Sequence, residues 1–177
     1  MSGSERVLPL FPLDQAVLFP GMSLPLRIFE ERYKFMIGAC QVTDQLFGVL
    51  LIRNGNEVGA PAQPERVGCT ARMVRVDRLP DGQMKILNVG EQRFRLLGPA
   101  RVMPEGYLVG DVRLLIDEPS AAVPAELVSS VAEQFGTYQQ AALAMSGRTD
   151  QPPLPQLPGD AVRLSYWVAS ALHVHPR

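Results

Sequence analysis

The stretch from Leu8 to Tyr33 constrains the fold more than any other part of this chain. It sets four prolines among short apolar runs and then changes to a charged segment with helical spacing. Proline has no amide hydrogen, so it does not fit a strand that is hydrogen-bonded on both sides. We therefore expect strand ends, sheet edges or bends at Pro9, Pro12, Pro20 and Pro25. The stretch predicts short, interrupted strands followed by a helix.

Short apolar runs separated by turn residues continue to about residue 116. Residues 46–53 form a continuous apolar run, which is typical of a strand buried on both faces. In residues 67–79 the apolar positions change phase between Met73 and Val74, which indicates a β-bulge that bends the sheet. Separate further strands are expected over residues 84–89, 93–97 and 107–116. Many short strands with a phase change favour a strongly curved sheet or a small barrel.

Three segments have the apolar spacing of helices. Residues 30–40 predict a helix that covers an apolar face, with a stripe made of Phe29, Tyr33, Met36, Ile37 and Cys40. Residues 123–145 predict a second helix, with a stripe made of Leu127, Val131, Phe135 and Tyr138. Asp160 is expected to cap a third, whose apolar face includes Val162, Leu164, Trp167, Val168 and Leu172. The proline-rich residues 151–159 are interpreted as a stiff connector rather than a P-x-x-P ligand.

These patterns predict an α+β protein with two parts. Residues 7–118 are expected to form a β-rich domain, a small curved-sheet pseudo-barrel with one inserted helix. Residues 119–177 are expected to form a carboxyl-terminal helical extension packed on or beside that domain.

Composition limits the classes of function. A net charge of −1 and a pI near 6.1 provide no overall basic field of the kind that attracts phosphate backbones, which disfavours nucleic acid as a partner. The two cysteines, Cys40 and Cys69, have no C-x-x-C spacing, so reduced and buried thiols are expected. No signal-peptide core or run of ~20 apolar residues is present, which predicts a cytoplasmic protein without membrane contact.

Motifs that would carry catalysis or hold a cofactor are missing from the sequence. Neither of the lysines, Lys34 and Lys85, stands in a G-x-x-x-x-G-K-[ST] phosphate loop, and no serine motif near them indicates a peptidase. His173 and His175 form an H-x-H without further ligands nearby and are interpreted as an exposed tail rather than a metal site. The sequence predicts no catalytic residues, no metal, no cofactor and no enzymatic activity.

Two expected loops are candidates for binding without catalysis. Methionine repacks readily against different partners and proline loses little entropy on binding, so exposed loops of this composition suit contact with flexible polypeptides. The candidate peptide-binding residues are Phe19, Pro20, Met22, Leu79, Pro80 and Met84. The alternative is that these side chains close the ends of the barrel.

An arginine row supports a second function class, RNA binding. Arginines beside aromatic residues on one sheet face could hold backbone and bases, and the row comprises Arg72, Arg75, Arg78, Arg93 and Arg95. Strand parity places Arg72 and Arg78 on one face and Arg75 on the other, unless the bulge between them corrects the phase. A solvated sheet face remains the simpler interpretation.

Three groups of residues, in order, resemble one known family. Leu8 to Tyr33 reads LPLFPL, VLFPGM and LPLRIFEERY; the later groups are VGCTA at residues 67–71, with RLPDG at 78–82, and VGEQRF at 89–94. This order is similar to the amino-terminal substrate-binding domain of Lon proteases, which also occurs as a free-standing bacterial protein. The matching positions are Phe11, Pro12, Pro20, Gly21, Arg27, Phe29, Glu30, Arg32, Tyr33, Gly68, Pro80, Asp81, Gly82, Gly90, Arg93 and Phe94.

The resemblance implies a PUA-like pseudo-barrel that recruits unfolded or tagged proteins and contains no catalytic residues. It thereby implies a protein-binding module that acts as an adaptor or regulator of proteolysis, with flexible polypeptides and a protease as partners. The same fold class includes RNA-binding domains, so the resemblance leaves the alternative of RNA binding open. Relatives continue into a further charged helix beyond the segment that ends here at His173 to Arg177.

Overall fold

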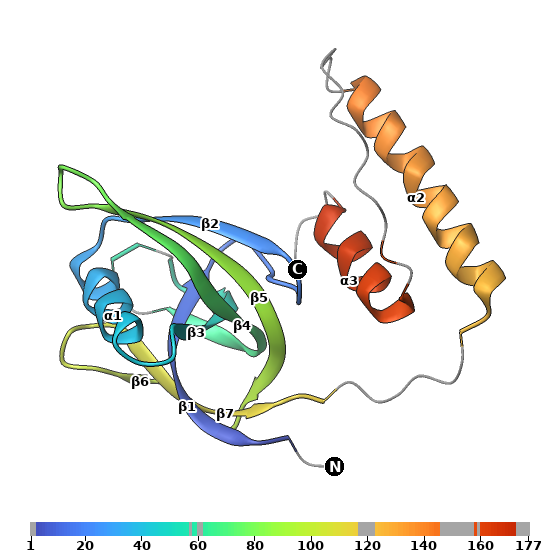
Figure 1. Cartoon of the computed structure of the whole chain (residues 1–177). Helices are drawn as coiled ribbons and strands as arrows, with labels where there is room; N and C mark the ends of the chain where they lie inside the picture. Colours follow the sequence, from blue (N-terminus) through green and yellow to red (C-terminus); the bar gives the residue numbers. More distant parts are fainter. Residues whose placement is uncertain are drawn as a thin grey trace. The chain divides into compact units, whose positions relative to one another are not determined.

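The protein is described by a computed structural model over residues 3–56, 58–59, 62–116, 123–145, 158 and 160–172. These residues contain seven strands and three helices and fall into two compact units, one up to Ile116 and one from Val123 to Leu172. The first unit is a curved sheet with one helix and the second consists of two helices (Figure 1). The predicted α+β fold with a curved sheet and a carboxyl-terminal helical part is confirmed.

Five strands of the first unit close into a small barrel. The pairing runs β5–β4–β3–β1–β7 and returns from β7 to β5, and only β1 and β3 are parallel. β2 (Ser23–Ile28) adds to β5, and the short β6 (Arg101–Val102) adds to β7. The barrel strands are β1 (Glu5–Leu13), β3 (Leu46–Asn54), β4 (Gln63–Arg78), β5 (Met84–Leu96) and β7 (Leu108–Leu114).

Two of the four prolines in the first stretch occupy positions within a strand, whereas the other two lie as predicted. Pro9 and Pro12 lie inside β1, rather than at its ends. β1 changes its neighbour along its length, because Glu5 to Leu10 pair with β7 whereas Leu10 to Leu13 pair with β3. Each proline therefore has a paired strand on one side only, where its missing amide hydrogen costs no ladder bond. Pro25 lies in the edge strand β2 and Pro20 in a turn, as expected.

The predicted bulge in β4 is confirmed, and one strand prediction is wrong. Met73 pairs with Asn88 but Arg75 pairs with Leu87, so Val74 is the extra residue. Residues 84–89 and 93–97 were predicted as two strands, whereas β5 is continuous from Met84 to Leu96. The intervening Gly90 has a packing reason rather than a turn, because a Cβ there would lie 2.2 Å from the carbonyl oxygen of Phe19.

Helix α1 (Glu31–Gln41) covers one face of the sheet (Figure 1). Its Tyr33, Met36, Ile37 and Cys40 are buried, as predicted from their spacing. Phe29, expected in the same stripe, lies before the helix and is 50 % exposed, so that part of the prediction is wrong. The four buried side chains of α1 join the helix-side core, whose strand residues include Phe11, Phe47, Val49, Cys69, Met73, Met84 and Ile86.

A second cluster, the barrel core, lies on the other face of β1 and β3. It comprises Leu8, Leu10, Leu46, Leu50, Phe94, Leu96, Leu108 and Val112. Alternate residues of β1 and β3 thus enter different cores, which explains why the apolar run at residues 46–53 is almost continuous. Gly48 is needed in this packing, because a Cβ there would lie 2.7 Å from the Phe94 ring.

The second unit is a pair of helices, α2 (Ala125–Met145) and α3 (Ala161–Ala171). The ring of Phe135 meets that of Trp167 edge-on, with 5.1 Å between the ring centres. Leu164 on α3 is buried. The predicted cap is confirmed, since Asp160 Oδ1 accepts a hydrogen bond of 2.9 Å from the amide of Arg163. The interpreted connector falls outside the described residues except for Pro158. No helix in the described ranges combines the length and apolarity needed to cross a membrane.

Candidate functional site

Two charged residues at the start of α1, Glu30 and Arg32, form a half-buried structural pair. Arg32 Nε lies 3.1 Å from Glu30 Oε2, and the two side chains are only 9 % and 17 % exposed. The same Glu30 oxygen accepts a hydrogen bond from the amide of Gly59. The Arg32 guanidinium lies 4.5 Å from the centre of the Tyr33 ring, which packs against Phe11. These contacts fix the entry into α1 and give the family-like F-E-E-R-Y segment a structural reason to be present.

The loop from Phe19 to Met22 is one of the two candidate peptide-binding segments, and it is firmly held. The amide of Gly21 donates to the carbonyl of Gly90 at 2.7 Å, and the amide of Gly90 donates back to Met22 at 2.9 Å. Phe19, Pro20 and Met22 are each half-buried, and Met22 packs against the helix-side core. The loop therefore presents part of three apolar side chains on a fixed backbone.

The second candidate segment is the turn between β4 and β5. The amide of Gly82, at φ +77°, donates to the carbonyl of Leu79, as the predicted tight turn requires. Pro80 is exposed and Leu79 is half-buried. Met84 is 3 % exposed and belongs to the helix-side core, so the expectation that it offers an exposed contact is wrong. Met84 is the first residue of β5, and its strand parity turns it inward with Ile86.

The structure does not bring the two candidate segments together. Met22 directly precedes β2, whereas Ile28 at the other end of β2 pairs with Met84. Arg27 Nε donates to Gln83 Oε1 at 2.7 Å, which places the turn at this second end. Six residues of strand span roughly 20 Å, so the two segments form separate surfaces.

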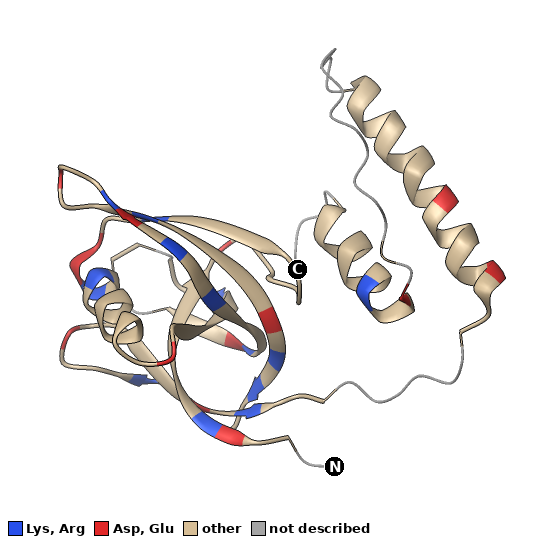
Figure 2. Cartoon of the chain, viewed as in Figure 1, with Lys and Arg blue, Asp and Glu red and all other residues tan. Residues whose placement is uncertain are grey.

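The arginine row is divided by its partners. The bulge brings Arg75 onto the face of Arg72, because they pair opposite Val89 and Leu87, which share a face of β5, whereas Arg78 pairs opposite Met84 on the other face. Arg72 is hydrogen-bonded to Glu91, and this bond raises the pKa of the Arg72 guanidinium. Arg75 lies 2.8 Å from Asp77. Figure 2 shows acidic as well as basic residues on these strands, and Glu91 and Asp77 pair with two arginines of the row.

Both thiols lie in the helix-side core. Burial raises the pKa of Cys40 and of Cys69 to about 12, so each stays a neutral thiol at physiological pH. The predicted free and buried state is confirmed for both. Within the described residues, no three His, Cys, Asp or Glu side chains gather in a way that could hold a metal ion. His173 and His175 lie outside the described residues.

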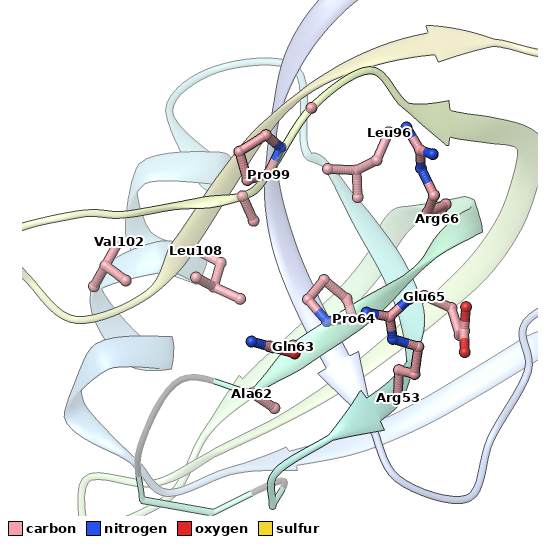
Figure 3. A pocket seen from close by; sticks show the side chains of 12 residues that line it. Arg53, Ala62, Gln63, Pro64, Glu65, Arg66, Leu96, Pro99, Val102 and Leu108 are labelled. Atoms are coloured by element: carbon pink, nitrogen blue, oxygen red, sulfur yellow. The ribbon is translucent and has the colours of Figure 1, made fainter.

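A cleft that sequence reasoning did not identify opens beside the barrel core (Figure 3). This β4–β6 cleft has a volume of about 580 Å³, which is within the range of ligand sites. Its lining residues come from the end of β3, the start of β4, the end of β5, β6 and β7: Arg53, Ala62, Gln63, Pro64, Glu65, Arg66, Leu96, Gly98, Pro99, Ala100, Val102 and Leu108. No motif marks them, because they come from five strands and from the chain just before β4 and just after β5, with one to four positions from each.

Comparison with known proteins places the chain in a family. The model of the substrate-binding domain of ATP-dependent protease La (LON) matches residues 7–177. The chain belongs to the LON substrate-binding domain family. A crystal structure titled as a Lon N-terminal domain protein from Xanthomonas campestris is 34 % identical, with a TM-score of 0.59, over 73 % of this chain and 72 % of that one.

Further relatives extend the likeness. The N-terminal domain of the Mycobacterium avium complex Lon protease shares the fold at 18 % identity and a TM-score of 0.56, over 80 % of this chain and 69 % of that one. A Lon protease of Roseiflexus castenholzii is 29 % identical over 76 % of this chain, and one of Parabacteroides distasonis is 28 % identical over 85 %. The chain spans only 16 % and 18 % of the lengths of those two proteases. The predicted membership of the Lon substrate-binding family is confirmed.

Proposed function

We propose that this chain is a non-catalytic module that binds unfolded or flexible polypeptide segments. The observation that carries the proposal is the match of the LON substrate-binding domain model over residues 7–177. Binding of protein substrates by this family gives the ligand class, and a role as adaptor or regulator of proteolysis, with a protease as partner, follows from it as part of the proposal.

The Phe19–Met22 loop supports this proposal physically. A binder of varied unfolded segments needs apolar contact area that costs little conformational entropy to present. Phe19, Pro20 and Met22 are half-buried on a loop whose backbone is hydrogen-bonded to Gly90 at Gly21 and Met22. Pro80 and Leu79 offer a smaller apolar surface at the tip of the β4–β5 turn.

The test is binding of a permanently unfolded, fluorescently labelled model protein, followed by fluorescence anisotropy. We expect saturable binding by the wild-type chain. Met22→Ser and Pro80→Ser are expected to weaken it about three- to tenfold each, because each removes an apolar contact from its surface. The matched control is Val42→Ser on α1, which removes a side chain that is 84 % exposed but lies outside both segments.

Two outcomes contradict the proposal at different levels. Absence of any saturable binding by the folded wild-type chain removes the polypeptide-binding function. Binding that both loop variants retain in full, and that Val42→Ser retains equally, leaves the function but removes these loops as its site. Folding of each variant is checked by its thermal unfolding transition.

A cytoplasmic location is the remaining part of the proposal. Cys40 and Cys69 are free and buried, which suits a reducing compartment. Fractionation of the native cell, followed by immunodetection of the chain, tests this part independently of binding.

A further inference from the structure

The barrel opens at one place, where β4 and β5 separate. Pairing between these strands begins only at Val67, opposite Arg95, although β4 starts four residues earlier at Gln63. Beyond Leu96 the chain follows β7 instead, since the amide of Leu97 donates to the carbonyl of Asp111 at 2.9 Å. The residues between Gln63 and Arg66 therefore have β3 on one side and no strand on the other among the described residues.

Two open strand edges border the resulting β4–β6 cleft. The first is the start of β4, from Gln63 to Arg66, and the second is β6, which is the last strand in the sheet order and pairs only with β7. Residues of both edges line the cleft. An open edge can accept backbone hydrogen bonds from an added strand, and a four-residue edge accommodates about 13 Å of extended chain.

The floor of the cleft is apolar and belongs to the barrel core. Leu96 and Leu108 are 4 % and 5 % exposed, and both line the cleft. Val102, which is 58 % exposed, stands at its rim, and Figure 3 shows Pro64 and Pro99 facing the same space. This arrangement provides pockets for alternate apolar side chains of a strand laid along the cleft.

Two arginines of the cleft differ from those arginines of the outer sheet that are held in ion pairs. Arg6, Arg72, Arg101 and Arg113 are each paired with a carboxylate. Arg53 and Arg66 line the cleft, are exposed, and have no carboxylate partner within the described residues. Glu65 is the only acidic side chain in the lining, so the lining carries a net positive charge. Negative charge on a ligand would complement it.

We propose that the β4–β6 cleft binds an extended polypeptide segment in which apolar residues alternate with acidic ones, added as a strand to the open edge of β4. The open edge supplies backbone hydrogen bonds, Leu96 and Leu108 contact the apolar side chains, and Arg53 and Arg66 pair with the acidic ones. The inference rests on the proposed polypeptide-binding function but assigns it a site distinct from the Phe19–Met22 loop. Pro64 lacks an amide hydrogen, so at this position the edge offers only a carbonyl acceptor to the added strand.

The experiment uses a fluorescein-labelled octapeptide that alternates valine with aspartate and threonine. We expect it to bind and to shift the backbone amide resonances of Gln63, Glu65 and Arg66 and of residues 100–102 in a ¹⁵N-labelled chain. Arg53→Glu combined with Arg66→Glu is expected to weaken binding about tenfold or more. Lys85→Glu is the matched control, because Lys85 is an exposed cation on β5 outside the lining.

N-methylated forms of the octapeptide test the strand pairing without any change to the protein. Alternate amides of an extended segment face the same neighbour, so methylation of one alternate set should abolish binding, whereas methylation of the other set should leave it within about twofold. An octapeptide with lysine in place of aspartate should bind at least tenfold more weakly.

The contrary outcomes separate the cleft from the proposed function. The proposed site in the cleft is overturned if neither the arginine reversal nor N-methylation changes the affinity of the octapeptide. It is also overturned if amide shifts appear only at residues 19–22 and Met22→Ser abolishes octapeptide binding, but that result supports the proposed function. Binding of the unfolded model protein without binding of the octapeptide likewise removes the cleft alone. If neither ligand binds, both proposals fail.

Discussion

The helix-side core and the barrel core share β1 and β3 but meet the solvent differently. The first is covered by α1 and the Phe19–Met22 loop, and a half-buried Glu30–Arg32 pair fixes the start of that helix. The second reaches the β4–β6 cleft at Leu96 and Leu108, where no element continues the sheet. Of the family-like motif residues, Phe11 and Tyr33 belong to the covered core and none lines the open cleft. The recognisable motifs and the β4–β6 cleft are therefore found in different places.

The largest expected effect on the free energy of unfolding distinguishes the buried Met84 from the exposed tip of the neighbouring turn. Met84→Asp buries a carboxylate in the helix-side core and should lower the free energy of unfolding by more than about 4 kcal/mol. Pro80→Asp lies at the exposed tip of the same turn and should change it by less than about 0.5 kcal/mol. Urea unfolding followed by circular dichroism measures both. A folded Met84→Asp variant with wild-type stability would contradict the placement of Met84 in the core.

The next effect distinguishes a half-buried ion pair from an exposed one. Arg32→Ala leaves the half-buried Glu30 without its charged partner and should cost about 2 kcal/mol of unfolding free energy. Arg27→Ala removes an exposed arginine, 3.9 Å from Asp81, and should cost less than about 1 kcal/mol. Equal losses in chemical denaturation would show that the Glu30–Arg32 pair does not fix the covered side of the molecule.

An effect of similar size distinguishes glycines beside the two surfaces. Gly90→Ala would place a Cβ 2.2 Å from the Phe19 carbonyl oxygen, so the loop must shift, and we expect a loss of about 2 kcal/mol. Gly98→Ala in the cleft lining meets no atom within 4 Å and should be neutral or stabilising by up to about 0.5 kcal/mol. Differential scanning calorimetry of both variants checks this. A greater loss for Gly98→Ala than for Gly90→Ala would reverse the comparison.

The smallest expected effect is a loss of folding stability at alkaline pH, caused by the two thiols of the helix-side core. Cys40 and Cys69 have pKa values raised from 9.0 to about 12 in the folded chain, so folding favours the neutral thiol. This stability is fully present below pH 9 and declines between pH 9 and about 12, by about 1 kcal/mol per thiol from pH 9 to 10. Urea unfolding at pH 9 and at pH 10 should show a smaller decline in unfolding free energy for a Cys40→Ala, Cys69→Ala variant than for the wild-type chain. An identical decline would assign it to other groups.

Local patterns predicted most of the elements and part of the site. The spacing of Tyr33, Met36, Ile37 and Cys40 gave α1 to within one residue, and the phase change at Val74 located the bulge. The burial of Met84 could not be predicted from the sequence. A shift of one residue in the strand register decides whether a methionine beside a turn faces inward, and the register depends on strand pairing. The continuity of β5 was missed for a similar reason: Gly90 resembles a turn residue until its contact with Phe19 is known.

The sequence by itself determined the family, the helices, the bulge and the reduced thiols, because these depend on side-chain periodicity and on motifs within short segments. Only the tertiary structure decided which prolines lie within strands, where the arginines find partners and where the barrel opens. These features depend on which strand lies beside which, over separations such as that between Gln63 and Val102. The cleft exists because β5 leaves β4 to follow β7, a choice of neighbour that no local pattern encodes.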